Sequence, residues 1–425
     1  MTTRLLAALL TLTPLSAAAD WPQFRGPAGN GLALGEAVPA TWDEDSNLAW
    51  RIDVPGDGWS APIVVAGKVL LTTTVPADGD DLTFEVHCYD LASGARLWKR
   101  VAKTGPPSEP THRDNTYASE TPVTDGERVY AYFGMNGLFC YDLSGEPVWS
   151  KDLGVYPMNN DWGASSSPVL VDGKLVLQID NREASFVVAL DAATGDEAWR
   201  AERPDEQSNW STPTVWRNSQ RTEVVLGGKT VRSYDPATGD ELWNLPIGGR
   251  SSATATAVGD TLYLGSENRV SRGGTPGGLF AVRAGAAGTI DPGDADSAKA
   301  NGLVWMNVRG AVGISSPLVY EGQIYVPERR GGVIRVHDAA TGEESYRKRL
   351  PGAAVIWASP FGVNGAVHIL DERGQTHVLA PGAEYEVLRQ NELPGRFWST
   401  PAVSDGSLVL RSQTELFCVR ATNGG

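Results

Sequence analysis

The chain has 425 residues, of which 41% are hydrophobic, and its 51 acidic and 36 basic residues give a formal net charge of −15. A surface this acidic repels phosphate backbones and anionic lipid head groups, so nucleic-acid binding is excluded as the expected function. The length suits about two or three ordinary domains, but a repeat protein of this size can also form one ring.

The first 19 residues have the features of a signal peptide. Arg4 precedes an apolar run, and small residues ending at Ala17-x-Ala19 favour cleavage before Asp20. No cysteine follows the run to carry a lipid anchor, and no later stretch approaches the ~18 apolar residues of a transmembrane helix. We therefore expect a soluble mature protein that is periplasmic or secreted, with an N-terminal extension over residues 20–46.

A strand with Trp50 is predicted next, in "NLAWRIDV" (47–54), and eight copies of one unit follow it. Each unit opens on a Ser-x-Pro phrase, which is usually preceded by an aromatic residue. The eight phrases are "WSAP" (59–62), "ASETP" (118–122), "SSSP" (165–168), "WSTP" (210–213), the degenerate "SATA" (252–255), "ISSP" (314–317), "WASP" (357–360) and "WSTP" (398–401).

Each phrase leads into alternating, β-branched segments such as "VLVDGKLVLQI" (169–179), where an Asp-Gly pair predicts a tight hairpin. A second hairpin follows, so that each unit has four strands, A to D. No single unit can bury its own face, so the units must stack against one another.

Strands C and D are joined by an Asp-x-x-Thr/Ser-Gly phrase, as in "DAATGDEAW" (191–199). The Asp carboxylate is expected to accept backbone N–H groups of the turn, and the glycine to take a positive φ. Four residues after the glycine comes an aromatic side chain that should be buried between its own blade and the next. These aromatic residues are Trp98, Trp149, Trp199, Trp243 and Tyr346.

The last unit stops at "ATNGG" (421–425), before a fourth strand, and the strand with Trp50 supplies the missing piece. These patterns predict an all-β fold: a single eight-bladed β-propeller of four-stranded antiparallel blades over residues 47–425, closed by pairing of the N-terminal strand with the C-terminal blade. The three cysteines, Cys88, Cys140 and Cys418, fall at one equivalent position of their repeats, so we expect small buried residues and no disulfide.

The repeated phrases resemble the tryptophan-docked repeats of the pyrroloquinoline quinone (PQQ) propeller superfamily, which includes quinoprotein alcohol dehydrogenases and BamB-type outer-membrane assembly proteins. "WPQFRGPAGNG" (21–31) and "NTYASETPVTDGERVYAYFG" (115–134) are similar to exported bacterial PQQ-like repeat proteins. The resemblance covers nearly all of the mature chain. It implies the fold more strongly than any function, because the repeated residues hold blades together.

The loop before each strand A and the hairpin between strands B and C should lie on one face, where a ligand would meet the channel mouth. Aromatic faces there suit quinones, sugars and cations, although the same rings could simply plug the funnel. The predicted aromatic ligand-binding residues are Trp59, Tyr117, Trp162, Trp210, Trp357 and Trp398.

The B–C hairpins repeat an acidic residue followed two places on by an arginine, in "DNR" (180–182), "ENR" (267–269), "ERR" (328–330) and "DER" (371–373). Arginine could bind a carboxylate or a pair of sugar hydroxyls through its planar fork, whereas each pair could equally be a solvated tip or an interblade ion pair. The predicted arginines are Arg182, Arg269, Arg330 and Arg373.

Three insertions depart from the unit length. Residues 101–117 should overhang the mouth and bring His112, Arg113 and Asp114 near it, and residues 269–278 should reach the same face. Residues 285–302 should extend from the opposite face.

No catalytic residue is assigned. A PQQ dehydrogenase, as the resemblance implies, needs calcium ligands, an aspartate base and, in the alcohol-oxidising branch, adjacent cysteines; no Cys-Cys pair exists here, although Glu267, Glu328 and Asp371 could fall near a channel ion. The five histidines lack metal-site spacing. PQQ with calcium stays possible as a cofactor, and none is assigned.

The sequence therefore favours a non-catalytic exported binding module, a monomer that binds a small molecule, a glycan or another exported protein. Two alternatives remain open: a PQQ-dependent oxidoreductase acting on an alcohol or aldose, and a BamB-like scaffold for outer-membrane protein assembly.

Overall fold

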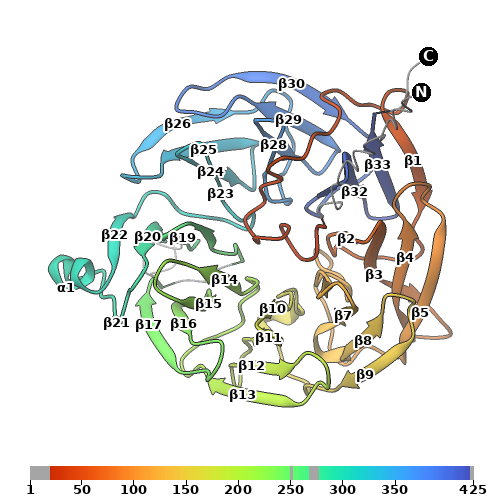
Figure 1. Ribbon diagram of the computed structural model, residues 1–425, viewed down its shortest axis with the longest axis horizontal. Helices are drawn as coiled ribbons and strands as arrows, with labels where there is room; N and C mark the ends of the chain where they lie inside the picture. Colours follow the sequence, from red (N-terminus) through yellow and green to blue (C-terminus); the bar gives the residue numbers. More distant parts are fainter. Residues whose placement is uncertain (1–19, 249–251, 268–276, 422–425) are drawn as a thin grey trace, which may run out of the picture.

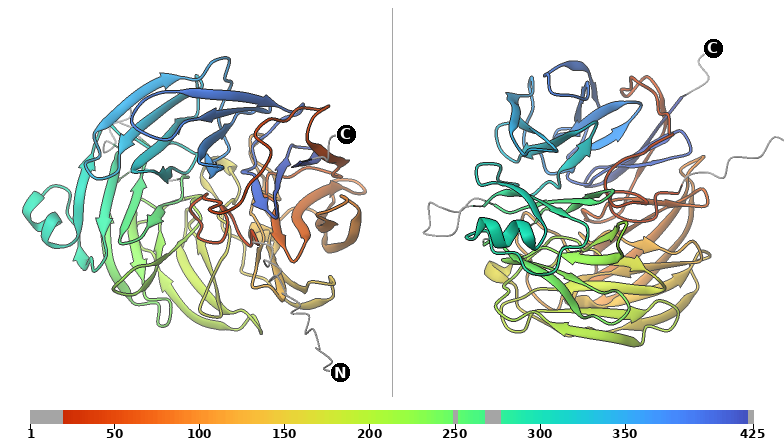
Figure 2. Two further views of the ribbon diagram at one scale, coloured as in Figure 1. Left: turned by 45° about the horizontal axis from the view of Figure 1, so that its top comes forward. Right: turned by 60° about the vertical axis from the view of Figure 1, so that its left-hand side comes forward.

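Eight antiparallel sheets stand around a central axis in the computed structural model, which describes residues 20–248, 252–267 and 277–421 (Figures 1 and 2). Each sheet has its strand A beside the axis and its strand D at the rim. The predicted eight-bladed all-β propeller is confirmed. The predicted signal peptide and Arg269 lie outside the described residues.

The first four blades follow the order of the chain, and the fourth has a short added strand. Blade 1 contains β2 (Ile63–Val65), β3 (Lys68–Pro76), β4 (Leu82–Asp90) and β5 (Arg96–Gly105). Blade 2 contains β6 (Val123–Thr124), β7 (Arg128–Tyr132), β8 (Leu138–Asp142) and β9 (Pro147–Lys151). Blade 3 contains β10 (Val169–Val171), β11 (Lys174–Ile179), β12 (Phe186–Asp191) and β13 (Glu197–Glu202). Blade 4 contains β14 (Thr214–Arg217), β15 (Thr222–Leu226), β16 (Thr230–Tyr234), β17 (Glu241–Pro246) and β21 (Gly288–Thr289).

The last four blades complete the ring, and the eighth takes its outer strand from the start of the chain. Blade 5 contains β18 (Thr256–Val258), β19 (Thr261–Gly265), β20 (Leu279–Arg283) and β22 (Leu303–Asn307). Blade 6 contains β23 (Leu318–Tyr320), β24 (Gln323–Glu328), β25 (Val333–Asp338) and β26 (Glu344–Arg349). Blade 7 contains β27 (Phe361–Val363), β28 (Ala366–Leu370), β29 (Gln375–Leu379) and β30 (Val387–Glu392). Blade 8 contains β31 (Ala402–Ser404), β32 (Ser407–Arg411), β33 (Glu415–Arg420) and β1 (Leu48–Asp53).

The ring closes where β1 pairs with β33 in antiparallel register, with Trp50 opposite Cys418. Residues from the two ends of the chain thus share one sheet, as the sequence predicted. Cys88 and Cys140 likewise lie opposite Trp98 and Trp149 in their own blades. All three thiols are free and buried, which is the expected environment of a small side chain facing a large ring.

The same type of contact recurs at five of the joints between neighbouring blades. The tryptophan on strand D lies over the glycine of the Asp-x-x-Thr/Ser-Gly turn in the next blade, and its indole N–H donates to a carbonyl of that turn. Trp149, for example, donates to the carbonyl of Ala192 at 3.2 Å and covers Gly195. The other four tryptophans are Trp50, Trp98, Trp199 and Trp305.

The joint between blades 4 and 5 is different. Trp243 donates its indole N–H to Glu223 of its own blade at 2.6 Å, and β21 runs parallel to β17 beside it. The insertion that contains β21 and the helix α1 (Ala295–Ala300) projects from the rim (Figure 1) and replaces the usual turn. Because of this insertion, Trp305 does not follow an Asp-x-x-Thr/Ser-Gly turn by four residues. The sequence pattern therefore missed it.

A girdle of hydroxyl groups joins the blades around the axis. The residue before the Ser-x-Pro proline is serine or threonine in seven blades, and each of these side-chain oxygens accepts the backbone N–H of the equivalent residue in the preceding blade, at 2.9–3.1 Å. The eighth position is Ala61, which has no hydroxyl, so the girdle is open between blades 8 and 1. The seven girdle residues are Thr121, Ser167, Thr212, Thr254, Ser316, Ser359 and Thr400.

Residues 20–42 cross the centre of the ring (Figure 1) on the side of the A–B hairpins. Trp21 pairs with Val64 of blade 1, and Leu32 pairs with Gly362 of blade 7. Between them, the buried Arg25 donates to Thr256 at 3.0 Å and to the carbonyl of Pro317 at 2.6 Å. The segment therefore closes one end of the central channel.

We expect Gly195→Ala to cost more stability than Gly173→Ala. Both glycines have φ near +75°, but a Cβ at Gly195 meets the Trp149 ring at 2.8 Å, while Gly173 has open space. The φ penalty of about 1–2 kcal/mol is common to both, and crowding adds roughly 1–3 kcal/mol at Gly195 alone. Urea unfolding of both variants measures the difference, and equal losses would contradict a close tryptophan–glycine contact.

The open girdle position predicts a stabilising substitution. Ala61→Ser supplies the missing acceptor and should raise the free energy of unfolding by about 1 kcal/mol, whereas Thr212→Val strands the buried N–H of Ser167 and should lower it by about 1–3 kcal/mol. Thermal and urea unfolding report both changes. A loss of stability in both variants would show that blades 8 and 1 do not approach as the others do.

Candidate functional site

A cavity of about 810 Å³ occupies the centre of the ring on the side of the Ser-x-Pro phrases. Its walls come from the loops before strand A and from the tips of the B–C hairpins, and the girdle hydroxyls lie within it. Phe24, from the crossing N-terminal segment, also lines it. We call this space the funnel, because the crossing segment closes its far end.

Five of the six predicted aromatic residues line the funnel, in two groups. In the first, Trp398 lies face to face with Trp357 and with Trp59, at centroid distances of 3.9 and 4.7 Å. In the second, Trp162 meets the edge of Trp210 at 6.5 Å. Side chains from opposite parts of the chain thus form two aromatic walls.

Arginines extend the first aromatic wall. The Arg329 guanidinium lies over the Trp357 ring at 4.8 Å, and Arg396 lies over Trp398 at 4.6 Å. Such contacts keep the rings in place and bring positive charge beside their faces.

Blades 5 and 6 bring most of the charge to the funnel. Of the predicted arginines, Arg330 lines it, together with others that the hairpin pattern did not indicate. The further lining arginines are Arg309, Arg329, Arg335 and Arg347. Arg329 lies beside Arg330 in the same B–C hairpin, whereas Arg309 comes from the loop before strand A and Arg335 and Arg347 come from strands C and D, where the hairpin pattern gave no signal.

Glu328 is already engaged in ion pairs. It accepts from Arg347 at 2.7 Å and 2.9 Å and from Arg335 at 3.0 Å. These two guanidinium groups, Arg347 first, hold the pKa of Glu328 below its usual value. The carboxylate therefore stays charged and orders two arginine side chains.

Arg182 and Arg373 are exposed and are not among the residues that line the funnel. The acidic partners in their hairpins support the backbone or the blade: Asp180 forms a buried two-bonded ion pair with Arg203, and Asp371 accepts backbone N–H groups of its own turn. The acidic residues of this recurrence thus support local structure in these two blades. Among the described arginines of the pattern, the structure does not bring Arg182 and Arg373 to the funnel with Arg330.

The insertion at residues 101–117 does reach the funnel. His112 stacks on Trp162 at 3.9 Å between centroids, and Asp114 lines the wall beside it. Arg113 is exposed and is not part of the described lining.

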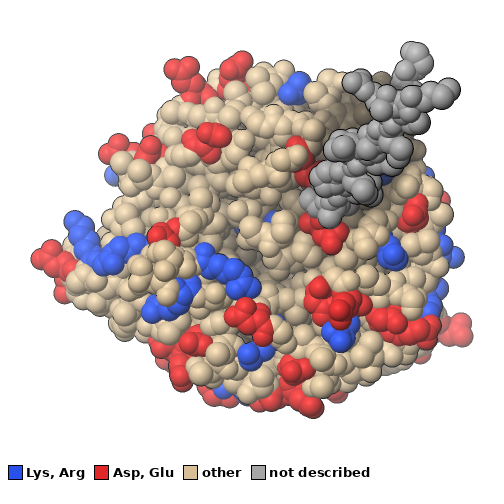
Figure 3. All heavy atoms as spheres, viewed as in Figure 1, with Lys and Arg blue, Asp and Glu red and all other residues tan. Residues whose placement is uncertain are grey.

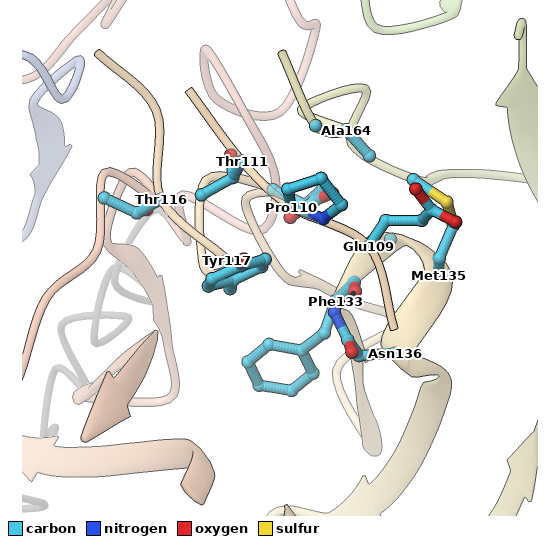
Figure 4. A pocket seen from close by; sticks show the side chains of 12 residues that line it. Glu109, Pro110, Thr111, Thr116, Tyr117, Phe133, Met135, Asn136 and Ala164 are labelled. Carbon is cyan, nitrogen blue, oxygen red and sulfur yellow. Dashed lines mark hydrogen bonds between the residues drawn. The ribbon is translucent and has the colours of Figure 1, made fainter. Parts of the chain in front are cut away.

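Tyr117 lies in a second, much smaller pocket beneath the same insertion, with Glu109, Phe133 and Met135 around it (Figure 4). Glu120 also lines this pocket and is buried. Burial raises the pKa of Glu120 to about 8, because no cation offsets the loss of water around the carboxylate. Glu120 is therefore largely protonated at neutral pH.

Glu120 predicts a pH-dependent stability. Between its ordinary pKa of 4.5 and the folded value of about 8, the folded state holds a proton that the unfolded state has lost, so stability falls as the pH rises through this window. Urea midpoints from pH 5 to pH 8.5 (about the span of the two pKa values) should decline more steeply for the native protein than for Glu120→Gln. Parallel curves would mean that Glu120 stays ionised.

The resemblance implies PQQ and calcium as a cofactor pair, which would need oxygen ligands for the metal and space for a flat quinone. Calcium takes about six to eight oxygen ligands, but the lining carboxylates Asp114, Glu267 and Glu328 come from separate blades, and Glu328 is bound by two arginines. Within the described ranges no group of three or more His, Cys, Asp or Glu side chains could hold a metal. The stacked tryptophans also leave no slot between their rings. These residues do not fit the quinone–calcium pair.

The fold, the Ser-x-Pro girdle and the aromatic turns together define a PQQ-like repeat propeller of eight blades. Residues 82–290, just under half of the chain, match the family model described as outer membrane protein assembly factor BamB. The predicted resemblance is therefore confirmed. In the part of the chain that the structure describes, no helix has the length and apolar character to cross a membrane.

Solved structures agree with this class. BamB from Moraxella catarrhalis has 13% identity and a TM-score of 0.60, covering 89% of this chain and 98% of its own. A europium-containing methanol dehydrogenase has 12% identity and a TM-score of 0.64, covering 93% and 90%. Quinohemoprotein alcohol dehydrogenase from Comamonas testosteroni has 12% identity and a TM-score of 0.61, covering 96% and 81%.

No curated protein sequence matches the chain. At identities this low, the structural likeness shows a shared fold and leaves the function to the residues of the funnel.

Proposed function

We propose that this chain is an exported, non-catalytic binding protein that takes a ligand into the funnel. The observation that carries the proposal is the funnel itself: a cavity of about 810 Å³ with five lining tryptophans, walls from most of the ring and one closed end. Binding sites are typically concave and apolar, with a few placed polar groups, in this range of volume.

The side chains of the funnel suit binding better than reaction. Glu328 is held in ion pairs, each girdle oxygen already accepts a backbone N–H, and the imidazole of His112, which lines the funnel, stacks on Trp162. A blind funnel retains a small ligand or the end of a chain, and does not pass a substrate through the ring.

Titration calorimetry and tryptophan fluorescence test the proposal with a panel of neutral and acidic saccharides and with PQQ plus calcium. Saturable binding that changes tryptophan emission is expected for at least one member of the panel. Uptake of PQQ with calcium, accompanied by quinone absorbance and reduction of a dye by an alcohol, would favour the oxidoreductase alternative instead.

Trp357→Ala should weaken binding by about tenfold, since it removes an aromatic side chain that lines the funnel and on which Arg329 rests. Trp305→Ala is the matched control: this partly buried tryptophan joins blades 5 and 6 away from the funnel and donates to Ala339. It should lower the melting temperature and leave the affinity unchanged. Equal affinities for all three proteins would make the funnel aromatics packing residues only.

A further inference from the structure

We infer that the ligand of the funnel is an acidic saccharide, whose carboxylate is held by arginines at the mouth and whose oxygen atoms accept from hydroxyl groups deeper in. The assignment rests on the proposed binding function and names its ligand class. Three features of the funnel support it: its hydroxyl hydrogens, its charge and its aromatic walls.

The seven girdle hydroxyls all line the funnel. Each oxygen accepts one backbone N–H from the preceding blade, so part of its acceptor capacity is used. A hydroxyl also has one hydrogen to donate, and within the described residues none of the seven donates to a protein acceptor. The girdle therefore offers a circle of donors to a ligand that is rich in acceptor oxygens.

Positive charge is in excess at the mouth. Five arginines line the funnel against three carboxylates, although the whole chain has a net charge of −15. Glu328 is shared by Arg335 and Arg347. Arg309 and Arg330 are exposed and form no ion pair with another described residue, and Arg329 rests on Trp357.

Guanidinium groups without a carboxylate partner favour an anion, because they can form charge-assisted, two-bonded contacts with a carboxylate. The acidic outer surface adds selectivity, since a non-specific anion is repelled elsewhere on the molecule. Figure 3, drawn from the same direction as Figure 1, shows such acidic side chains spread around the rim.

Aromatic walls distinguish a sugar from a simple anion. Trp162 and Trp210 are partly exposed and line a space far larger than an inorganic ion needs. A pyranose ring has apolar C–H faces for such walls and oxygen atoms for the donors below. An acidic sugar combines these features with the carboxylate that the arginines require.

Calorimetry with a galacturonate trisaccharide and the neutral galactose trisaccharide of the same linkage tests the inference, at about 0.02 M and 0.15 M salt. Benzene-1,3,5-tricarboxylate serves as an anion without a sugar ring. The acidic sugar should bind at least about tenfold more tightly than the neutral one, and the difference should shrink at the higher salt concentration.

Arg309→Gln and Arg330→Gln should each weaken acidic-sugar binding by about tenfold, without change in any binding of the neutral sugar. Arg182→Gln and Arg373→Gln are matched controls, since these exposed arginines occupy the equivalent hairpins of other blades outside the funnel lining. Both controls should bind as the native protein does. All four side chains are exposed, so unchanged melting temperatures are expected throughout.

Equal affinity for the acidic and neutral sugars, or equal behaviour of all four arginine variants, would overturn the acidic assignment and leave the binding function standing. Tighter binding of the benzene tricarboxylate than of either sugar would overturn the saccharide assignment. If no member of the wider panel bound or changed tryptophan emission, the proposed binding function itself would fail.

Discussion

The structure depends on the contact between a tryptophan on the outer strand of one blade and the glycine turn of the next. A single four-stranded sheet leaves both faces exposed, so no blade of this chain is stable alone. The Asp-x-x-Thr/Ser-Gly turn presents a surface without a Cβ, and the indole of a residue such as Trp149 covers it and donates to its carbonyl. Five of the eight joints between blades are fixed at the rim in this way.

The girdle fixes the same blades near the axis. Its hydrogen bonds run from one Ser-x-Pro phrase to the next, so the blades are joined near the axis as well as at the rim. The pairing of β1 with β33 completes blade 8 and closes the ring. With the blades held at the rim and near the axis, the centre of the ring stays open. The crossing segment around Arg25 then closes one end, and the channel becomes a funnel.

In this fold, the side chains around the mouth of the funnel determine what the protein can bind. The structural neighbours include BamB and alcohol dehydrogenases. They share the propeller fold with this chain at a sequence identity of only 12–13%. The repeated residues maintain the ring, whereas the loops before strand A and the hairpin tips vary from blade to blade. Here those loops bring tryptophans to two walls and arginines mainly to blades 5 and 6.

The sequence alone determined the blade number, the closure at Trp50 and five of the lining tryptophans, because these features recur at fixed spacing and local turn chemistry dictates them. Only the tertiary structure showed that Arg330 lines the funnel while Arg182 and Arg373 do not. It also showed that Tyr117 lies in a separate small pocket and that Arg309 lines the funnel. Equivalent positions in different blades point to the same face of the ring, but the ion pairs and loop lengths around each one decide how far its side chain reaches toward the axis.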